Sequence, residues 1–559
     1  MRARPAGDAA LLVQADGLAD RLAAAIVSQR IAGVLDVVPG AATVLVTTQP
    51  GSVELGELAE RVLGLPLPVA SPAGSALAEL PVVYDGPDLA EVARLTGLPA
   101  DEVVARHAAR EYRVGWLGFS PGFGYLTGLD PALATVPRLA EPRLRVPAGS
   151  VAIAGGLAAV YPSASPGGWR LLGRTPETLW DPQRNPPALL SPGMRVRFRP
   201  VDTAFPAHAL PATPARGPRA VPDGPGSPPG SLIEVLRPGP LATVQDLGRP
   251  GFGHLGVPHS GAADAASLRL ANRLAGNPAG AAGIELTLGR AVLGFPSGGW
   301  AAVAGAIATV TLRPRAGSTT RGGPGGGPGG GAGHGPGGAG PGRPRDGAAR
   351  DVRHGEAFRV PAGWLVEVGP PALGLRSYVA VRGGIDVPAV LGSRSADLRS
   401  GLGPAPLRAG DKLPVGPAGL PPAGGPAAAE APLPGEPAVL RVIPGPRDDW
   451  FAPGALERLC DSTYSVSPAS DRTGLRLDGP GLPRPDGHEL PAEGVVTGAL
   501  QVPPGGRPIL LLADHPVTGG YPVLAVVACA DIGIAGQLRP GSQLRFTLGR
   551  GAYPGLISP

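Results

Sequence analysis

The sequence predicts an α+β protein that is mainly β, with a small N-terminal α/β unit followed by about three β-barrel units. Two observations support this fold class. The 89 glycines and 72 prolines among 559 residues favour short strands and tight turns over long helices. Short strand–turn–strand phrases also recur: RVPAG lies at 145–149 and 359–363, and LLSPGMRVRF at 189–198 is echoed by QLRPGSQLRF at 537–546. A fainter echo, PLRAGDKLPV, lies between them. We interpret these repeats as related barrels.

The N-terminal unit is predicted over residues 1–75. LLV at 11–13 is typical of a strand, and VLDVV and TVLVTT flank a Pro-Gly turn, which indicates an antiparallel hairpin. Asp16 is placed to cap a helix whose apolar face consists of Leu18, Leu22, Ala25 and Ile26. A second helix is predicted over 101–110.

Composition places the domain boundaries, because loose segments rich in Pro and Gly separate the patterned ones. A chain of this length needs several hydrophobic cores. The first module is expected at 1–200, with a barrel over 76–200, and the second at 231–551. The remaining boundaries are a linker at 201–230, a Gly-rich insert at 316–348, a loose segment at 416–437 and a last unit at 438–551.

Charge and cysteine content exclude several classes of protein. The net charge is +5, and the arginines are scattered rather than striped, which disfavours a nucleic-acid partner. Cys460 and Cys529 are the only cysteines and cannot form a disulfide framework. The start carries no secretory signal, and no apolar run is long enough for a membrane helix. We therefore expect a cytoplasmic protein without a membrane partner.

Several motifs resemble catalytic signatures but lack their physical requirements. GFSPG at 118–122 matches a nucleophile elbow, yet Pro121 has no N–H to offer an oxyanion, so a turn is predicted. GFGHLG at 251–256 is not followed directly by a helix, which disfavours a dinucleotide site. The single lysine, Lys412, is not in a phosphate-binding loop, and the eight histidines show no metal-ligand spacing. We predict no metal site.

Candidate binding residues of the first module are three arginines near glycines and aromatic residues: Arg143, Arg145 and Arg174. Guanidinium groups suit carboxylate or phosphate ligands, although surface ion pairs explain these arginines equally well.

The second module concentrates polar residues in a Gly-rich turn that packing alone does not explain: Gln245, Asp246, Arg249 and Ser260. Asp264 is better interpreted as the N-cap of a helix over 265–275, which Gly276 ends. The last unit adds polar residues at the ends of apolar strands: Ser470, Asp471, Arg472, Glu493, Asp514, Thr518 and Tyr521. Among all these candidates, Asp246, Asp471 and Asp514 are predicted to be catalytic, and the others to bind substrate or nucleotide.

The first module carries GFSPGF, RVPAGSVAIAG, YPSASPGGW and LLGRTP, and resembles the allophanate hydrolase subunit 1 family, which includes the B subunit of 5-oxoprolinase. The second carries TVQDLGRPGFGHLGVPHSGAAD, GSRS, PGPRDDWF, SPASDRTGLRL, EGVVTGALQVP and LLADHPVTGGYP, and resembles the subunit 2 family, which includes the C subunit of 5-oxoprolinase. Together they resemble the carboxyltransferase domain of urea carboxylase. The resemblance implies cyclophilin-like barrels and a site where the modules meet.

Two stretches depart from the pattern of these families. Gly156, Leu157, Ala158 and Ala159 replace a Gln-Thr-Gly stretch, and His515-Pro516 replaces Arg-Gln. Polar side chains are therefore missing at two family positions, which bears on substrate identity.

The resemblance implies a component of ATP-dependent 5-oxoprolinase, which opens a small-molecule cyclic amide together with a separate protein that is similar to the A subunit of 5-oxoprolinase. ATP is then a substrate, which the partner could bind. A biotin-dependent carboxyltransferase component acting on urea or another amide is the alternative enzyme. Covalent biotin needs a lysine flanked by methionine, and Lys412 has no such neighbour, so this chain carries no biotin of its own. A non-enzymatic module of the kinase-inhibitor type is a further alternative.

Overall fold

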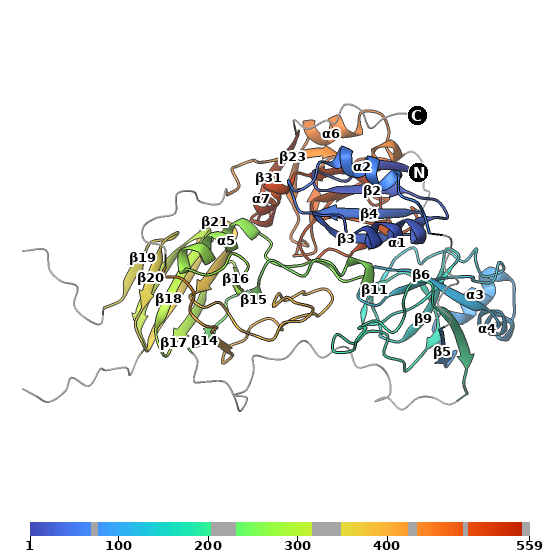
Figure 1. Cartoon of the computed structure of the whole chain (residues 1–559), viewed down its shortest axis with the longest axis horizontal. Coiled ribbons are helices and arrows are strands. Elements are labelled where there is room, and N and C mark those ends of the chain that lie inside the picture. The colour runs from blue at the N-terminus through green and yellow to red at the C-terminus, as the bar shows by residue number, and fades with distance from the viewer. Residues whose placement is uncertain (69–75, 203–230, 316–347, 423–432, 485–489, 550–559) are drawn as a thin grey trace, which may run out of the picture.

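The computed structural model describes residues 1–68, 76–202, 231–315, 348–422, 433–484 and 490–549 (Figure 1). The fold is mainly β with few short helices, as predicted. Most of the predicted linker at 201–230 and of the insert at 316–348 lies outside the described residues, as does part of the loose segment at 416–437.

The N-terminal unit is a four-stranded antiparallel sheet in the order β1-β2-β4-β3. One face packs Leu11, Val13 and Val46 against two helices, while the other face packs Leu12 and Leu45 against the last unit. This two-sided burial follows from the near-continuous apolar strands. The elements are β1 Arg2–Pro5, β2 Ala10–Gln14, α1 Ala19–Gln29, β3 Val34–Pro39, β4 Thr43–Thr48 and α2 Leu55–Leu63.

The predicted N-cap at Asp16 is wrong. Helix α1 begins at Ala19, and Leu18 occupies the cap position without a side-chain hydrogen bond. The Leu18 N–H already donates to the Ala15 carbonyl at 2.8 Å, so a tight turn separates Asp16 from the helix. The Asp16 carboxylate instead accepts from the Gln14 amide. The predicted apolar face is confirmed, since Leu22, Ala25 and Ile26 are buried.

The second unit is a seven-stranded sheet in the order β12-β9-β10-β7-β6-β13-β5. A single bridge between Val83 and Arg174 joins its two edges, so the sheet is nearly a barrel. The helix predicted over 101–110 is observed as α4. The elements are β5 Leu77–Val82, α3 Leu89–Thr96, α4 Ala100–Ala108, β6 Glu111–Leu117, β7 Gly124–Thr127, β8 Arg143–Val146, β9 Ser150–Ala154, β10 Leu157–Val160, β11 Ser165–Gly167, β12 Arg170–Arg174 and β13 Arg195–Pro200.

The middle unit is an open nine-stranded sheet rather than a closed barrel. Two long strands, β18 and β21, pair along most of their length, and register shifts near Gly305 bend the ribbon without closing it. The predicted cap of α5 is confirmed, because the Asp264 carboxylate accepts from Ser267 N–H and Gly276 ends the helix. The elements are β14 Leu232–Arg237, β15 Leu241–Gln245, α5 Ala265–Ala275, β16 Gly283–Thr287, β17 Ala291–Phe295, β18 Gly299–Pro314, β19 Arg350–Val352, β20 Ala357–Val360, β21 Trp364–Val381 and β22 Lys412–Pro414.

The last unit contains a closed barrel in the order β23-β30-β27-β28-β25-β24-β31. Its core is separate from those of the other units. The prediction of about three barrels is thus right for this unit, nearly right for the second and wrong for the middle one. The elements are β23 Ala438–Pro444, α6 Ala455–Asp461, β24 Thr463–Val466, β25 Gly474–Asp478, β26 Glu493–Gly494, β27 Ala499–Gln501, β28 Ile509–Leu511, β29 Thr518–Gly519, β30 Val523–Val527, α7 Ile532–Gly536 and β31 Gln543–Leu548.

The sequence echo between residues 189–198 and 537–546 reflects a structural repeat between the second and last units. In both, the first strand pairs in parallel with the last: β5 with β13, and β23 with β31. A glycine follows each first strand where a side chain would meet backbone, since a Cβ would lie 2.3 Å from the Leu171 carbonyl oxygen at Gly86 and 2.3 Å from that of Val523 at Gly445. The fainter echo in β22 differs, because β22 pairs antiparallel with β14.

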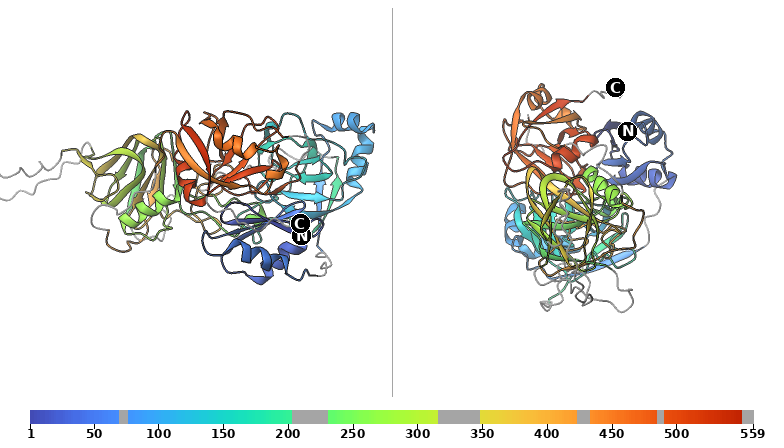
Figure 2. Two further views of the ribbon diagram at one scale, coloured as in Figure 1. Left: turned by 90° about the horizontal axis from the view of Figure 1, so that it is seen from above. Right: turned by 90° about the vertical axis from the view of Figure 1, so that its left-hand side faces the viewer.

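The two modules pack tightly against each other, with the N-terminal unit beside the last unit (Figure 2). Val257 and Leu402 of the middle unit belong to the hydrophobic core of the second unit. The Asp36 carboxylate accepts from the N–H groups of Gly251 and Gly253 at 2.9 and 2.7 Å. In the described part of the chain, no helix is long and apolar enough to cross a membrane.

Candidate functional site

Strand β15 ends at Gln245 and delivers Asp246 into a buried turn of the middle unit. The Asp246 carboxylate accepts from Gly248 N–H at 2.8 Å, Ser393 Oγ at 2.7 Å and Arg394 N–H at 2.6 Å, and it also accepts from Ser395 Oγ. Its oxygens are therefore occupied in holding the GSRS turn at 392–395. This environment suits a residue that shapes the site rather than one that transfers a proton.

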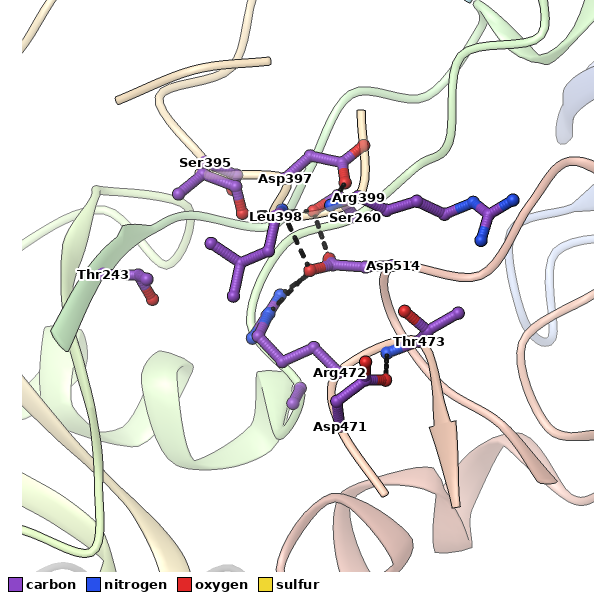
Figure 3. A network of polar contacts seen from close by, with 12 residues as sticks. Thr243, Ser260, Ser395, Asp397, Leu398, Arg399, Asp471, Arg472, Thr473 and Asp514 are labelled. Atoms are coloured by element: carbon purple, nitrogen blue, oxygen red, sulfur yellow. Dashed lines mark hydrogen bonds and ion pairs between the residues drawn. The ribbon is translucent and has the colours of Figure 1, made fainter. Parts of the chain in front are cut away.

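A second buried cluster joins the middle unit to the last unit. Arg472 donates from Nε and Nη2 to the two Asp514 carboxylate oxygens at 2.9 and 3.0 Å, and Ser260 Oγ donates to Asp514 Oδ1 at 2.7 Å (Figure 3). Arg472 also donates to Glu285. Burial alone would raise the pKa of Glu285, but Arg472 and Arg376 hold it below its ordinary value. Ser260 has a positive φ (55°), which is uncommon for a residue other than glycine. In this conformation its hydroxyl contacts Asp514.

Next to this cluster lie a buried cation, Arg249, with unmet bonding capacity and a buried acid, Asp397. The Asp397 carboxylate accepts from the N–H groups of Arg399 and Ser400 at 3.0 and 3.1 Å and from Ser400 Oγ. Arg249 is 1% exposed and donates from Nη2 to the Ser395 carbonyl, while its Nε and Nη1 have no hydrogen-bond partner among the described residues. Burial lowers the pKa of Arg249, although Asp397 and Asp246 oppose that shift. Burial, together with the charge of Asp514, raises the pKa of Asp397 to about 6. Asp397 can therefore exchange a proton close to neutral pH.

Arg399 connects this region to the first module. Its guanidinium lies over the ring of Phe119, 5.2 Å from the centroid, and it points away from Asp514 (Figure 3). No hydrogen bond or ion pair holds the guanidinium among the residues that the structure describes. Burial lowers the pKa of Arg399, with Asp397 and Asp471 opposing the shift. The arginine is thus a cation at the junction with free donors.

The first module contributes a loop that contacts the last unit directly. Phe119 has positive φ (61°), and its N–H donates to Thr518 Oγ1 at 2.8 Å. Tyr125 Oη lies 3.4 Å from the same hydroxyl. A Cβ at Gly118 would lie 2.5 Å from Thr518 Oγ1, so glycine permits this close approach. The turn predicted for GFSPG is confirmed, and its role is to join the modules.

Two of the three arginines predicted in the first module have carboxylate partners within that module. Arg143 pairs with Asp88 at 2.6 Å, and Arg174 pairs with Asp85 at 2.9 Å. Arg145 is exposed on the two-stranded antiparallel sheet of β8 and β11. The surface ion-pair alternative thus describes Arg174, whereas Arg143 pairs with a buried carboxylate and its buried Nη1 has no hydrogen-bond partner among the described residues.

The candidates of the last unit divide between the junction and its surroundings. Asp471 is exposed, and its carboxylate caps the turn at Thr473 N–H (2.7 Å). Ser470 accepts from Arg476 N–H, and Tyr521 is 38% exposed. Glu493 is buried against Arg447 at 2.6 Å, and burial raises its pKa. The structure therefore brings together Gln245, Asp246, Arg249, Ser260, Arg472, Asp514 and Thr518, but not the arginines of the first module.

Sequence reasoning missed Asp397, Arg399, Phe119 and Tyr125. A signal existed for the first two, because they directly follow the GSRS turn, which is rich in the polar residues that shape binding loops. No local signal marks Phe119, since its position depends on Thr518, which is 399 residues away. The described residues contain no group of three or more His, Cys, Asp and Glu residues that could hold a metal ion.

The arrangement offers two kinds of chemistry at one junction. Arg399 and the buried Arg249 provide guanidinium donors that suit a carboxylate or a developing negative charge. Asp397 provides a carboxyl group whose pKa lies near physiological pH. Such a pair suits an anionic substrate that must gain or lose a proton.

Comparisons with known proteins agree with this two-module organisation. The family described as carboxyltransferase domain, subdomain C and D, matches residues 1–190, and the family described as carboxyltransferase domain, subdomain A and B, matches residues 255–321 and 339–548. The solved structure of TTHA0988 superposes with a TM-score of 0.79 at 37% identity, covering 96% of this chain and 99% of that one.

Curated relatives match each module separately. The second module is 34% identical over 318 residues to the C subunit of 5-oxoprolinase from Escherichia coli, covering 56% of this chain and 90% of that protein. The first is 56% identical over 125 residues to the B subunit of 5-oxoprolinase from the same species, covering 22% of this chain and 57% of that protein. Urea amidolyase of Lachancea kluyveri is 32% identical over 340 residues, which are 56% of this chain and 17% of that protein. The chain belongs to the carboxyltransferase-domain family, with a module like the B subunit of 5-oxoprolinase followed by a module like its C subunit.

Proposed function

We propose that this chain is a component of an ATP-dependent 5-oxoprolinase, which hydrolyses the cyclic amide of 5-oxoproline to glutamate together with a separate protein like the A subunit of that enzyme. The observation that carries the proposal is the junction itself. Homologues of the B and C subunits are fused here, and their contact surface holds Arg399 with free guanidinium donors beside Asp397.

The chemistry of the substrate matches these two residues. The carboxylate of 5-oxoproline needs a cationic donor, and Arg399 is a guanidinium at the contact between the modules that has no carboxylate partner among the described residues. The lactam itself is a poor electrophile. Transfer of the ATP γ-phosphoryl group to the amide oxygen, with release of ADP, makes the ring carbon reactive toward water. The ring C–N bond then breaks, and its nitrogen takes up a proton.

Asp397 is the candidate donor of that proton. A carboxyl group with a pKa of about 6 is partly protonated near neutral pH, whereas an ordinary aspartate is not. A second water releases phosphate from the resulting acyl phosphate and yields glutamate. We assign ATP binding to the partner, because this chain has no phosphate-binding loop with a lysine.

The test is release of ADP and glutamate from 5-oxoproline and ATP by this protein mixed with its host's homologue of the A subunit. Release is expected only when both proteins are present. Arg399→Met should raise the KM for 5-oxoproline at least tenfold. Arg174→Met is the matched control, because it removes a half-buried arginine that pairs with Asp85 away from the junction. Equal effects of the two variants would refute the role of Arg399.

A carboxyltransferase of the urea amidolyase type is the second candidate, and the match to urea amidolyase over the second module favours it. It predicts activity that requires bicarbonate and a biotinylated carrier protein, because Lys412, the only lysine of this chain, lacks a flanking methionine. Product formation without biotin or bicarbonate would exclude this candidate.

A further inference from the structure

A cavity of about 230 Å³ lies between the N-terminal unit and the last unit. Strands β3 and β4 form one wall, and His515, Val517 and the end of β30 form the opposite wall. His259 reaches it from the middle unit. Figure 2 shows the two units side by side, with the N-terminal unit in blue and the last unit in orange to red. The proposed function does not use this cavity.

The charges around the cavity disfavour an anion. Among the residues that the structure describes, no arginine or lysine contributes to its lining. Its two carboxylates are already engaged: Asp8 accepts from Cys529 N–H at 3.1 Å, and Asp36 accepts from Gly253 N–H at 2.7 Å. A carboxylate ligand would therefore lose its hydration and meet two acids without a cation among the described lining residues. Most of the other lining residues are apolar, among them Val38, Leu45 and Val526.

His515 supplies a hydrogen-bond acceptor in this otherwise apolar wall. Its Nδ1 lies 2.7 Å from the Pro516 carbonyl oxygen, which can only accept, so Nδ1 carries the hydrogen. Burial lowers the pKa of His515 to about 4, so the ring is neutral and Nε2 holds a free lone pair. Within the described part of the chain, Nε2 has no hydrogen-bond partner.

We propose that this cavity is a binding site for a small uncharged molecule that carries an N–H or O–H donor, of which a neutral primary amide is the simplest example. The ligand's apolar body packs on the valines and leucine, and its donor reaches His515 Nε2. A cavity of 150 Å³ holds benzene, so one of about 230 Å³ has room for a benzene ring with one substituent.

The site is separate from the junction but adjacent to it. His259 and His515 directly neighbour Ser260 and Asp514, whose side chains are hydrogen-bonded to each other at 2.7 Å. A ligand in the cavity thus touches the two backbone segments that position the Ser260–Asp514 pair. Occupancy should change the conformation or the rigidity of the junction.

The test uses three probes of nearly the same shape: benzamide, methyl benzoate and benzoate. Benzamide has neutral N–H donors, methyl benzoate has no donor, and benzoate has a negative charge. Ligand-observed NMR titrations with the full chain measure each Kd. Benzamide should bind best, methyl benzoate about three- to tenfold more weakly because a hydrogen bond is lost, and benzoate weakest. Equal binding of the three probes, or preferred binding of benzoate, would overturn the proposal.

Two variants locate the binding. His515→Phe keeps an aromatic ring without the acceptor. It should raise the Kd of benzamide to that of methyl benzoate and leave the Kd of methyl benzoate unchanged. Thr47→Trp fills the cavity from β4 and should abolish binding of both neutral probes. Thr127→Trp, on strand β7 away from the cavity, is the steric control and should bind like the wild type. Benzamide binding that survives Thr47→Trp, or that 5-oxoproline displaces competitively, would assign the probe to another site and refute the proposal.

Discussion

Replacement of Arg472 by alanine should destabilise the contact between the middle unit and the last unit. The side chain is 2% exposed, donates twice to Asp514 and once to the Gly261 carbonyl, and pairs with Glu285. Three of these bonds join the guanidinium to a carboxylate, and each is worth about 1.5–3 kcal/mol when it is removed alone. They share one guanidinium and are not additive, so the sum overstates the loss. Breaking a buried ion pair by removing one partner costs about 3–5 kcal/mol, and we expect Arg472→Ala to fall in this range.

Amide hydrogen exchange in strands β25 and β28 measures this change where it occurs, which matters because a chain of several units does not unfold in a single step. A loss of 3–5 kcal/mol corresponds to exchange about two to three and a half orders of magnitude faster. Arg507→Ala is the control, since Arg507 pairs with Asp478 at 3.1 Å with 74% of its side chain exposed. That variant should change stability by less than about 1 kcal/mol.

The effect of Arg472→Ala should also depend on pH. In the wild type the pKa of Glu285 lies below its ordinary value, so the stabilisation is present above about pH 4.3 and is lost as pH falls through the folded-state pKa. Without Arg472, only Arg376 and the Ala263 N–H oppose the effect of burial, so the pKa of Glu285 should rise and protonation should relieve part of the unpaired charge. The deficit relative to wild type should therefore shrink between pH 7 and pH 5. A deficit below 1 kcal/mol at pH 7, equal to that of Arg507→Ala, would refute this account of the cluster.

Three further predictions concern the junction. Because the pKa of Asp397 is raised to about 6, its own contribution to stability should fall as pH rises from about 4 to 6. The difference between wild type and Asp397→Asn in urea unfolding should therefore change over this range, and a constant difference would contradict the pKa. Thr518→Val keeps the shape but not the acceptor, so exchange of the Phe119 amide should be about tenfold faster, and wild-type exchange would show that the bond contributes nothing. Gly118→Ala places a Cβ 2.5 Å from Thr518 Oγ1 and should lower Tm by several degrees. The double variant with Thr518→Ala should recover part of this loss of Tm. If the two losses simply add, the clash is not the cause.

Local signals predicted much of the fold. The helix at 265–275 and its cap at Asp264 follow from side-chain spacing and from a carboxylate that can reach its own helix. The hairpin of β3 and β4 follows from its turn. The predicted N-cap at Asp16 was wrong because the Leu18 N–H donates to the Ala15 carbonyl, which forms a turn between Asp16 and the helix. Which sheets close could not be told from local signals, because closure depends on pairs about a hundred residues apart: Val83 with Arg174, and Ala438 with Leu544.

The site was predictable in its parts but not in its assembly. Polar residues in the Gly-rich turns at 245–260 and 470–472 were identified, and the structure joins them through Asp514. Arginines near glycines in the first module looked equally suitable, yet Arg143 and Arg174 pair with carboxylates of their own unit. Arg399 could not be distinguished from them, because what marks it is the lack of such a partner.

The parallel pairing of first and last strands has a consequence for how the chain folds during synthesis. Leu77 pairs with Arg195 and Ala438 with Leu544, separations of 118 and 106 residues. Neither sheet can complete its hydrogen-bonded edge until its final strand has left the ribosome, and such long-range pairing is slow. The edges of β5 and β23 stay open until then. A truncated version that ends before β13 or β31 would leave that edge exposed and should aggregate, so each cloned unit needs its closing strand.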